Sequence, residues 1–207
     1  MSRYWLARLA CRLAGVIGAS SLMAAIAQAA TFTQNGPIAS LSGPITAGDD
    51  LRLNAFLHRP EAAQIRLLYL NSPGGMVYEA YKMSEIVRAA NLSTAVDASH
   101  AYCASACTAL FVAGVRRYYL NAQTIVDGDP RQKRGLGFHE ASDWSGGRFA
   151  ITRRSSFEGN NIMAYVYREM GVPGASNLTE RASYTGIYWV SGPTALSLSI
   201  ATSLSKP

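Results

Sequence analysis

A run of apolar segments and glycine-bearing turns between Leu67 and Thr108 narrows the choice of fold for this chain. Its first part, residues 67–70, is apolar and ends in Asn-Ser-Pro-Gly-Gly. Pro73 fixes one φ angle, and Gly74 and Gly75, which lack a Cβ atom, can take unusual backbone angles or approach a ligand closely. The segment therefore predicts a strand that ends in a turn with outward-facing backbone N–H groups.

The residues after this turn predict a helix and a second strand. Apolar side chains recur three and four residues apart over residues 76–90, and residues 92–96 form a short apolar run. Strand, helix and strand in this order make a right-handed βαβ crossover. A turn of small residues around Ser105 follows and opens an apolar helix that stops at Gly114. Because the C-terminal ends of neighbouring parallel strands lie side by side, we expect the two turns to meet at one rim of the sheet.

The first 29 residues are typical of a secretory signal peptide. Three arginines accompany a stretch of apolar, mostly small residues, 13–27, and Ala-Gln-Ala at 27–29 matches a cleavage site. We expect residues 1–29 to be removed and residues 30–207 to form the mature domain, which would be periplasmic or secreted. An uncleaved membrane anchor is the alternative, although the apolar stretch is short for a membrane span.

Together with residues 136–139, Leu-Gly-Phe-His, the two turns and the crossover resemble the proteolytic subunit of the Clp protease, within the Clp protease and crotonase superfamily. The resemblance extends from about Ile38 to about Ile200, and the cysteine-flanked serine behind a signal peptide is similar to predicted periplasmic members of the group. It implies an α/β fold, a Clp protease/crotonase-like spiral of βαβ units. With 207 residues, 49% of them hydrophobic, the chain suits a single domain with a core of its own.

Charge and composition argue against several classes of function. Removal of the signal takes away three arginines and no acids, so the formal net charge falls from +6 to +3. The remaining basic residues lack the interleaved aromatic residues of single-stranded nucleic-acid binders, which argues against a nucleic-acid partner. The sequence contains no P-loop, and its two mature cysteines have no further zinc ligands nearby. We therefore expect neither a cofactor nor a metal ion.

The mature chain keeps two cysteines, Cys103 and Cys107, on either side of Ser105. An even pair in an exported protein favours a disulfide. If both lie on one helix, their Cα atoms are about 6 Å apart on a shared face, within disulfide range, while Ser105 points to another side. We expect a bridge that makes the turn rigid, with two buried free thiols as the alternative.

Ser105 is the candidate nucleophile. The expected helix would give it free backbone N–H groups and a positive dipole end, both of which favour developing negative charge. A serine hydroxyl needs a base, and the resemblance assigns that role to His139, with His100 as the rival. The backbone N–H groups of Gly75 and Ala106 are the candidate oxyanion hole. The alternatives are a small packing serine and an ordinary glycine turn.

The third member of a catalytic triad is absent from its expected position. In the family an aspartate that orients the histidine precedes the final helix, and the matching residue here is Ile187. The acids that could replace it are Asp127, Asp129, Glu140 and Asp143. A backbone carbonyl could also orient His139, so we expect a Ser-His dyad or a triad with a displaced acid.

The other segments carry weaker signals. We expect a flexible start at residues 31–36, strands at 37–46, 65–70, 116–120 and 123–126, and helices at 49–58, 157–170, 177–184 and from 191 onward. Residues 127–135 are predicted to be a solvated surface loop, with an active-site lid as the alternative, and residues 142–147 a further loop. In the family, the helix matching 157–170 makes subunit contacts.

The sequence thus predicts an exported serine hydrolase that acts as a peptidase on peptide or protein substrates. An exported enzyme would not meet an ATP-driven unfoldase, so no ATPase partner is expected, and the family resemblance favours a homo-oligomer. A catalytically silent binding or scaffold protein of the same fold is the first alternative, because the acid is missing at Ile187. A crotonase-like protein that binds acyl-CoA is the second, which export disfavours.

Overall fold

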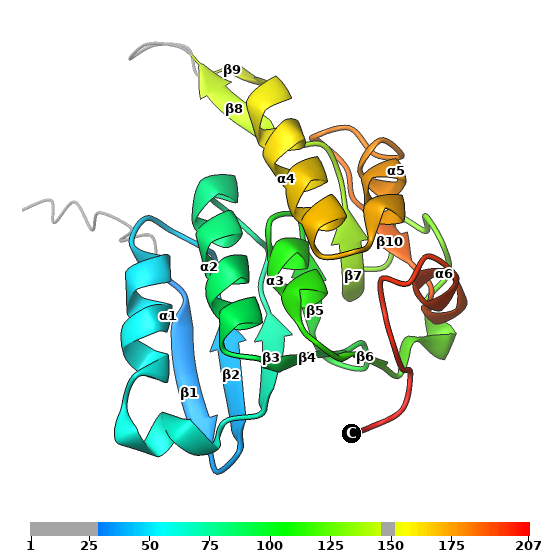
Figure 1. Cartoon of the computed structure of the whole chain (residues 1–207). Coiled ribbons are helices and arrows are strands. Elements are labelled where there is room, and N and C mark those ends of the chain that lie inside the picture. Colours follow the sequence, from blue (N-terminus) through cyan, green and yellow to red (C-terminus); the bar gives the residue numbers. More distant parts are fainter. Residues whose placement is uncertain (1–28, 146–151) are drawn as a thin grey trace, which may run out of the picture.

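The computed structural model describes residues 29–145 and 152–207. Its largest layer is a five-stranded sheet with the strand order β1-β2-β3-β4-β6 (Figure 1). Strands β2, β3, β4 and β6 are parallel, whereas β1 pairs with β2 in the antiparallel sense at the edge. The strand bounds are Thr31–Asn35 for β1, Ile38–Ser42 for β2, Leu67–Asn71 for β3, Ser93–Asp97 for β4 and Arg117–Leu120 for β6.

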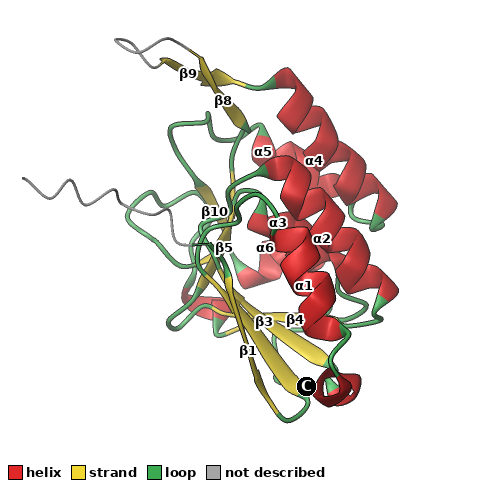
Figure 2. Ribbon diagram, turned by 90° about the vertical axis from the view of Figure 1, so that its left-hand side faces the viewer, coloured by secondary structure: helices red, strands yellow, loops and turns green. Residues whose placement is uncertain are grey.

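The longer helices lie together on one side of the strands (Figure 2). They are α1 (Asp49–Leu57), α2 (Val77–Ala89), α3 (Cys107–Ala113) and α4 (Phe157–Glu169). Helix α2 connects β3 to the parallel strand β4, which is the predicted βαβ crossover. The shorter helical elements are 3-10 turns at Pro60–Gln64, Ala122–Thr124 and Pro173–Ala175, and the helices α5 (Ser176–Thr179) and α6 (Gly192–Ser197).

A second sheet has the strand order β10-β7-β5. Its strands are β5 (Tyr102–Ala104), β7 (Gly135–Phe138) and β10 (Tyr188–Val190). A bridge between Ser72 and Cys103 joins this sheet to the end of β3, so the segments that follow β3 and β5 leave at the same edge. Strands β8 (Ser142–Ser145) and β9 (Thr152–Ser155) form an antiparallel hairpin at the top of Figure 1, close to the start of α4.

Side chains of β3 alternate between two faces, as a strand requires. Leu68 and Leu70 are buried in the main core with the helices, whereas Leu67 and Tyr69 belong to a smaller apolar cluster. Helix α3 is buried on every side, because all seven of its residues are apolar or small. The turn that carries Ser105 leads directly into this buried helix and is therefore anchored in the core.

Most elements expected from the sequence are present. Helices α1, α2, α3 and α4 and strands β2, β3, β4 and β6 lie where the patterns predicted them, and α6 begins after Ser191, whose hydroxyl accepts a hydrogen bond from Thr194 N. The expected helix at residues 177–184 is shorter, covering only Ser176–Thr179. The polar segment that starts at Asp127 is a largely exposed loop, as expected.

Three expectations were wrong. Residues 31–35 are not a flexible terminus, because a turn at Gly36, whose φ is +56°, folds them back onto β2 as strand β1. Residues 122–124 form a 3-10 turn in place of a strand, after Asn121 takes a left-handed backbone. The described part of the expected loop 142–147 is strand β8, which pairs with β9.

The predicted signal peptide lies outside the described residues, except for its last residue, Ala29. Among the described helices, the longest have 13 residues, and none has both the length and the apolar character that crossing a bilayer requires. The prediction of residues 1–29 as a cleaved segment, and of export, therefore stays a prediction.

Candidate active site

The two turns predicted to meet at one rim are in contact. A Cβ atom placed on Gly74 would lie 2.8 Å from both Ala106 N and Ser105 Cβ. A Cβ atom on Gly75 would lie 2.1 Å from the carbonyl oxygen of Ile45. Their φ angles of +85° and +146° are ones that other residues rarely adopt. Glycine is therefore needed at both positions for the backbone segments to approach this closely.

Ser105 lies in a turn between β5 and α3 and has a left-handed backbone, with φ at +56°. We expected it in the first helical turn, but the helix begins at Cys107, with Ala106 as its N-cap. The cause is strand β5, which stays extended up to Ala104 while Ser105 N–H donates to the carbonyl oxygen of Gly137 in β7 (2.9 Å). The half-buried serine thus stands on a sharp strand-to-helix turn.

The carbonyl oxygen of Ser105 accepts two hydrogen bonds from Thr108, one from its backbone N–H (2.9 Å) and one from Oγ1 (2.6 Å). Thr108 Oγ1 also lies 2.7 Å from the hydroxyl oxygen of Tyr167 in α4. Burial raises the pKa of Tyr167, so its hydroxyl stays protonated. The sequence analysis did not single out Thr108 or Tyr167. Tyr167 could have been noticed, because it is an aromatic residue with a hydroxyl group on the apolar face of α4, four residues after Met163.

Two backbone N–H groups at this contact, those of Gly75 and Ala106, have no hydrogen-bond acceptor within the described part of the chain. The peptide group between Gly74 and Gly75 is nevertheless held in place. Its carbonyl oxygen, which belongs to Gly74, accepts a hydrogen bond from Ile45 N (2.8 Å). Met76 N in turn donates to the carbonyl oxygen of Ile45 (3.0 Å). Gly75 lines the cavity that Ser105 faces, whereas Ala106 is absent from its described lining. Two amides close to a serine can stabilise a negatively charged oxygen.

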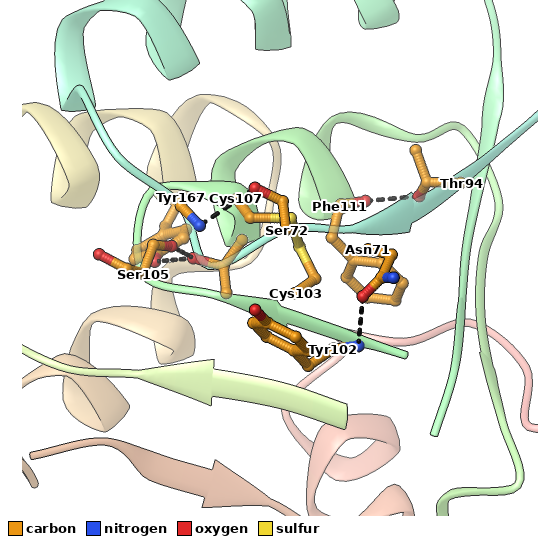
Figure 3. The surroundings of a disulfide bond; sticks show 11 residues. Asn71, Ser72, Thr94, Tyr102, Cys103, Ser105, Cys107, Phe111 and Tyr167 are labelled. Carbon is orange, nitrogen blue, oxygen red and sulfur yellow. Dashed lines mark hydrogen bonds between the residues drawn. A yellow bond between two sulfur atoms is a disulfide. The ribbon is translucent and has the colours of Figure 1, made fainter. Parts of the chain in front are cut away.

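The expected disulfide between Cys103 and Cys107 is present beside Ser105 (Figure 3). The reason given for it was wrong in part, because Cys103 lies in strand β5 and only Cys107 is helical, so the two do not share a helix face. Their Cα atoms are 5.2 Å apart because the Ser105 turn brings the strand end back to the helix start. Both cysteines are fully buried, and the bridge spans the turn while Ser105 faces a cavity.

Ser105 and His139 line the same cavity, which has a volume of about 730 Å³. His139 directly follows β7, and its Nδ1 atom is buried. Among the described residues that line the cavity, His139 is the one with a basic side chain. The rival His100 is not in that lining; its side chain is 72% exposed, and its Nδ1 atom lies 2.9 Å from Ser99 Oγ. The structure thus brings the candidate nucleophile and His139 to one cavity and leaves His100 outside it.

The four acidic residues considered as the third member of a catalytic triad lie in different places. Asp143 lines the cavity with His139, and Glu140 is absent from its described lining. Asp127 caps the start of α6, where its carboxylate accepts three hydrogen bonds. Asp129 binds Arg131 (2.8 Å), and hydrogen bonds from Arg131 lower the pKa of Asp129 to about 2. Among the described residues there is no group of three or more His, Cys, Asp or Glu side chains that could hold a metal ion.

Ile187 directly precedes strand β10, just as His139 directly follows β7. Strand β10 pairs with β7 so that Tyr188 lies opposite Phe138, and this is the last pair of the ladder on the side of Ile187 and His139. The Ile187 side chain is half-buried against the core, and its Cγ2 atom would lie 2.6 Å from a Cβ atom placed on Gly137. The place where the resemblance implies an acid is therefore filled by an apolar side chain.

The cavity continues into an apolar groove between α2 and α4. Tyr78 and Ile162 line both hollows, and the groove, of about 470 Å³, is otherwise formed mainly by Tyr81, Phe157 and Tyr165. The rings of Tyr81 and Tyr165 meet edge to face at 6.0 Å. Phe157 is 82% exposed and Tyr78 57% exposed. Exposed aromatic side chains gathered in a groove commonly mark a binding surface.

No protein-family model and no curated protein matches the sequence. The fold is similar to solved structures of 1510-N, a membrane-bound stomatin-specific protease. One, a variant with a serine replaced by alanine, has a TM-score of 0.56 and 12% identity, over 82% of this chain and 79% of that chain. Another, with a lysine replaced by alanine and in complex with a substrate peptide, has a TM-score of 0.55 and 12% identity, over 82% of this chain and 74% of that chain. The predicted α/β fold of the Clp protease and crotonase type is thereby confirmed.

Proposed function

We propose that this protein is a serine hydrolase, and specifically a peptidase, with Ser105 as nucleophile and His139 as general base. The observation that carries the proposal is the pair of amides beside Ser105, which have no acceptor among the described residues. Ala106 is only 1% exposed, and buried N–H groups are normally paired, whereas Gly75 is exposed. A serine that merely packs in a tight turn gives no reason for this arrangement, whereas an oxyanion hole formed by Gly75 and Ala106 does.

In the proposed reaction Ser105 Oγ attacks the scissile carbonyl carbon while His139 takes the hydroxyl proton. The carbonyl electron pair moves onto the oxygen, and the N–H groups of Gly75 and Ala106 bind the resulting anion. The C–N bond then breaks, and His139 gives its proton to the leaving amine. Water, deprotonated by the same histidine, attacks the acyl-enzyme and releases the acid and Ser105. Each oxyanion donor contributes about 10² to 10³ in rate.

The proposal includes a dyad, or a triad completed by Asp143. Ile187 stands at the position where the resemblance implies the orienting acid, so no carboxylate is expected there. Asp143 is the acid of the four candidates that shares the cavity with His139. An orienting acid can be worth about 10⁴ in turnover, so a dyad would be a slow enzyme.

The groove between α2 and α4 supports a polypeptide as the substrate. It is open to solvent along an exposed aromatic surface and continuous with the cavity at Tyr78 and Ile162. A chain with its scissile bond at Ser105 can therefore lay apolar side chains against these rings. The similar protease 1510-N was solved in complex with a substrate peptide, which agrees with this choice.

We further propose that the enzyme is exported to the periplasm or beyond and works without an ATP-driven partner. The disulfide supports an oxidising compartment, where such bonds persist. A homo-oligomer is proposed from the family resemblance alone, and analytical ultracentrifugation of the mature protein measures it.

A fluorescent fluorophosphonate, which reacts with activated serines, tests the proposed function. We expect label on Ser105 by mass spectrometry of the digested protein, no label in Ser105→Ala, and labelling slowed by about 10² or more in His139→Gln. Ser142→Ala is the matched control, because Ser142 lines the same cavity and has no proposed catalytic role. A folded wild-type protein that takes no label would instead support the catalytically silent scaffold, which the apolar Ile187 favours.

A further inference from the structure

A chain of hydrogen bonds from α4 ends on the peptide group of the candidate nucleophile. The Thr108 hydroxyl has one proton, which it donates to the carbonyl oxygen of Ser105 at 2.6 Å. The Tyr167 hydroxyl, 2.7 Å from Thr108 Oγ1, must then donate its own proton to Thr108. The order is Tyr167 O–H, Thr108 O–H, Ser105 C=O, and Figure 3 shows Tyr167 beside Ser105.

The Ser105 carbonyl and the Ala106 N–H belong to one planar peptide unit. In a trans peptide these two groups point in opposite directions, so an anchor on the carbonyl oxygen fixes the direction of the N–H group. A hydrogen bond to the oxygen also polarises the peptide and strengthens its N–H as a donor. The chain therefore acts on the candidate oxyanion donor from behind, without reaching the substrate.

Burial makes this chain effective. Thr108 is fully buried and Tyr167 is 1% exposed, so water does not compete for the two hydroxyls. Neutral groups form every link, and polarisation along a hydrogen-bonded chain is greater in a low-dielectric interior than in water. Helix α4 thus carries both Ile162, which lines the cavity, and the anchor of the Ser105 turn.

We propose that Thr108 and Tyr167 are positioning residues that aim and polarise the Ala106 N–H toward the oxyanion of the proposed hydrolase reaction, on which this inference rests. The substrate oxygen becomes charged only in the transition state, so the chain acts on the reaction step and leaves ground-state binding unchanged. With a fluorophosphonate, the maximal inactivation rate falls when the chain is cut, and the half-saturating probe concentration stays the same.

The variants Thr108→Val and Tyr167→Phe cut the chain at its two links. We expect Thr108→Val to slow inactivation about tenfold and Tyr167→Phe about threefold, because the second leaves Thr108 in place. Thr108→Ser keeps the hydroxyl and restores most of the rate. In the double variant the tyrosine change adds nothing further, because Tyr167 acts only through Thr108.

Thr94→Val is the matched control. Thr94 is also fully buried, and its Oγ1 donates to the carbonyl oxygen of Phe111 at 2.6 Å, near the far end of α3 (Figure 3). This variant loses the same kind of hydrogen bond, so its thermal stability falls like that of Thr108→Val, but its inactivation rate changes less than about twofold.

Equal rate losses in Thr94→Val and Thr108→Val, or losses only in thermal stability, would show that the chain is structural and overturn the inference. The hydrolase proposal would survive that result, because wild-type labelling at Ser105 is measured in the same experiment. If the wild-type protein is not labelled at Ser105, both the hydrolase proposal and the positioning role of Thr108 and Tyr167 are wrong.

Discussion

The two candidate oxyanion donors are supported in different ways. Gly75 N–H belongs to a peptide whose carbonyl oxygen is held by another backbone group, Ile45 N, at 2.8 Å. Ala106 N–H belongs to a peptide whose carbonyl oxygen is held by Thr108, through a side-chain hydroxyl as well as a backbone N–H. A side-chain support can be removed by substitution, whereas a backbone support can only be displaced.

The residues around the two supporting hydrogen bonds also differ in charge. The residue after Ile45 donates its N–H to Asp49, which is fully buried (2.7 Å). The next residue of the same helix, Asp50, binds Lys82 at 2.7 Å, and Lys82 also binds Glu79 at 2.8 Å. Carboxylates thus lie behind the Gly75 side, and the hydrogen bond from Lys82 lowers the pKa of one of them, Asp50, whereas the chain behind Ala106 contains no carboxylate. Acid should accordingly disturb one side of the proposed oxyanion hole and spare the other.

The largest effect is expected at Gly75. Gly75→Ala places a Cβ atom against the backbone of Ile45 and strains a φ of +146°, so it displaces the amide. We expect fluorophosphonate labelling to slow by about 10² to 10³, the value of one oxyanion donor. Gly186→Ala is the control, because nothing lies within 4 Å of its Cβ position. Unchanged labelling in Gly75→Ala would remove this residue from the proposed site.

A smaller effect is expected from the disulfide. Replacing Cys103 and Cys107 by serine together frees the Ser105 turn, and we expect labelling to slow about tenfold through misplacement of the nucleophile. The enclosed loop is short, so the unfolding temperature should change little. A reductant should reproduce the loss in the wild type and have no effect on the double variant. Equal rates in the oxidised and reduced wild type would contradict a role for the bridge.

The smallest effect is expected at Asp50. The hydrogen bond from Lys82 lowers the pKa of Asp50 below its ordinary value of 3.8. Its stabilising effect is thus complete above the unfolded-state pKa and is lost as the pH falls through the lower folded-state pKa. Asp50→Asn should cost about 1 kcal/mol of unfolding free energy at neutral pH. The difference from wild type should vanish in strong acid, which urea unfolding at both pH values measures.

Asp129→Asn is the control for that experiment. Asp129 pairs with Arg131 in an exposed loop, and an exposed pair contributes little to stability. If Asp50→Asn and Asp129→Asn lower the unfolding free energy equally at neutral pH, the ion pairs of Asp50, Lys82 and Glu79 do not stabilise the structure behind Gly75.

Local patterns sufficed for the βαβ unit and for the glycine turn. Apolar runs and helical apolar spacing in residues 67–96 predicted β3, α2 and β4, and Pro73 with two glycines marks the end of β3. The strands β5 and β10, with three residues each, were not predicted, because three residues are too few to show a period. The Ser105 turn was consequently placed in a helix that starts two residues later.

The amino-acid sequence by itself determined the parallel crossover, the glycines at its end and the cysteine pair, because each depends on residues close together in the chain. Tertiary structure alone decided the left-handed backbone of Ser105, the cavity that it shares with His139 and the hydrogen bond between Thr108 and Tyr167. Their partners lie tens of residues away, from Ser105 to Gly137 and from Thr108 to Tyr167. Pairings over such separations leave no periodic trace in the sequence, since they form only when β7 and α4 pack against the buried helix α3.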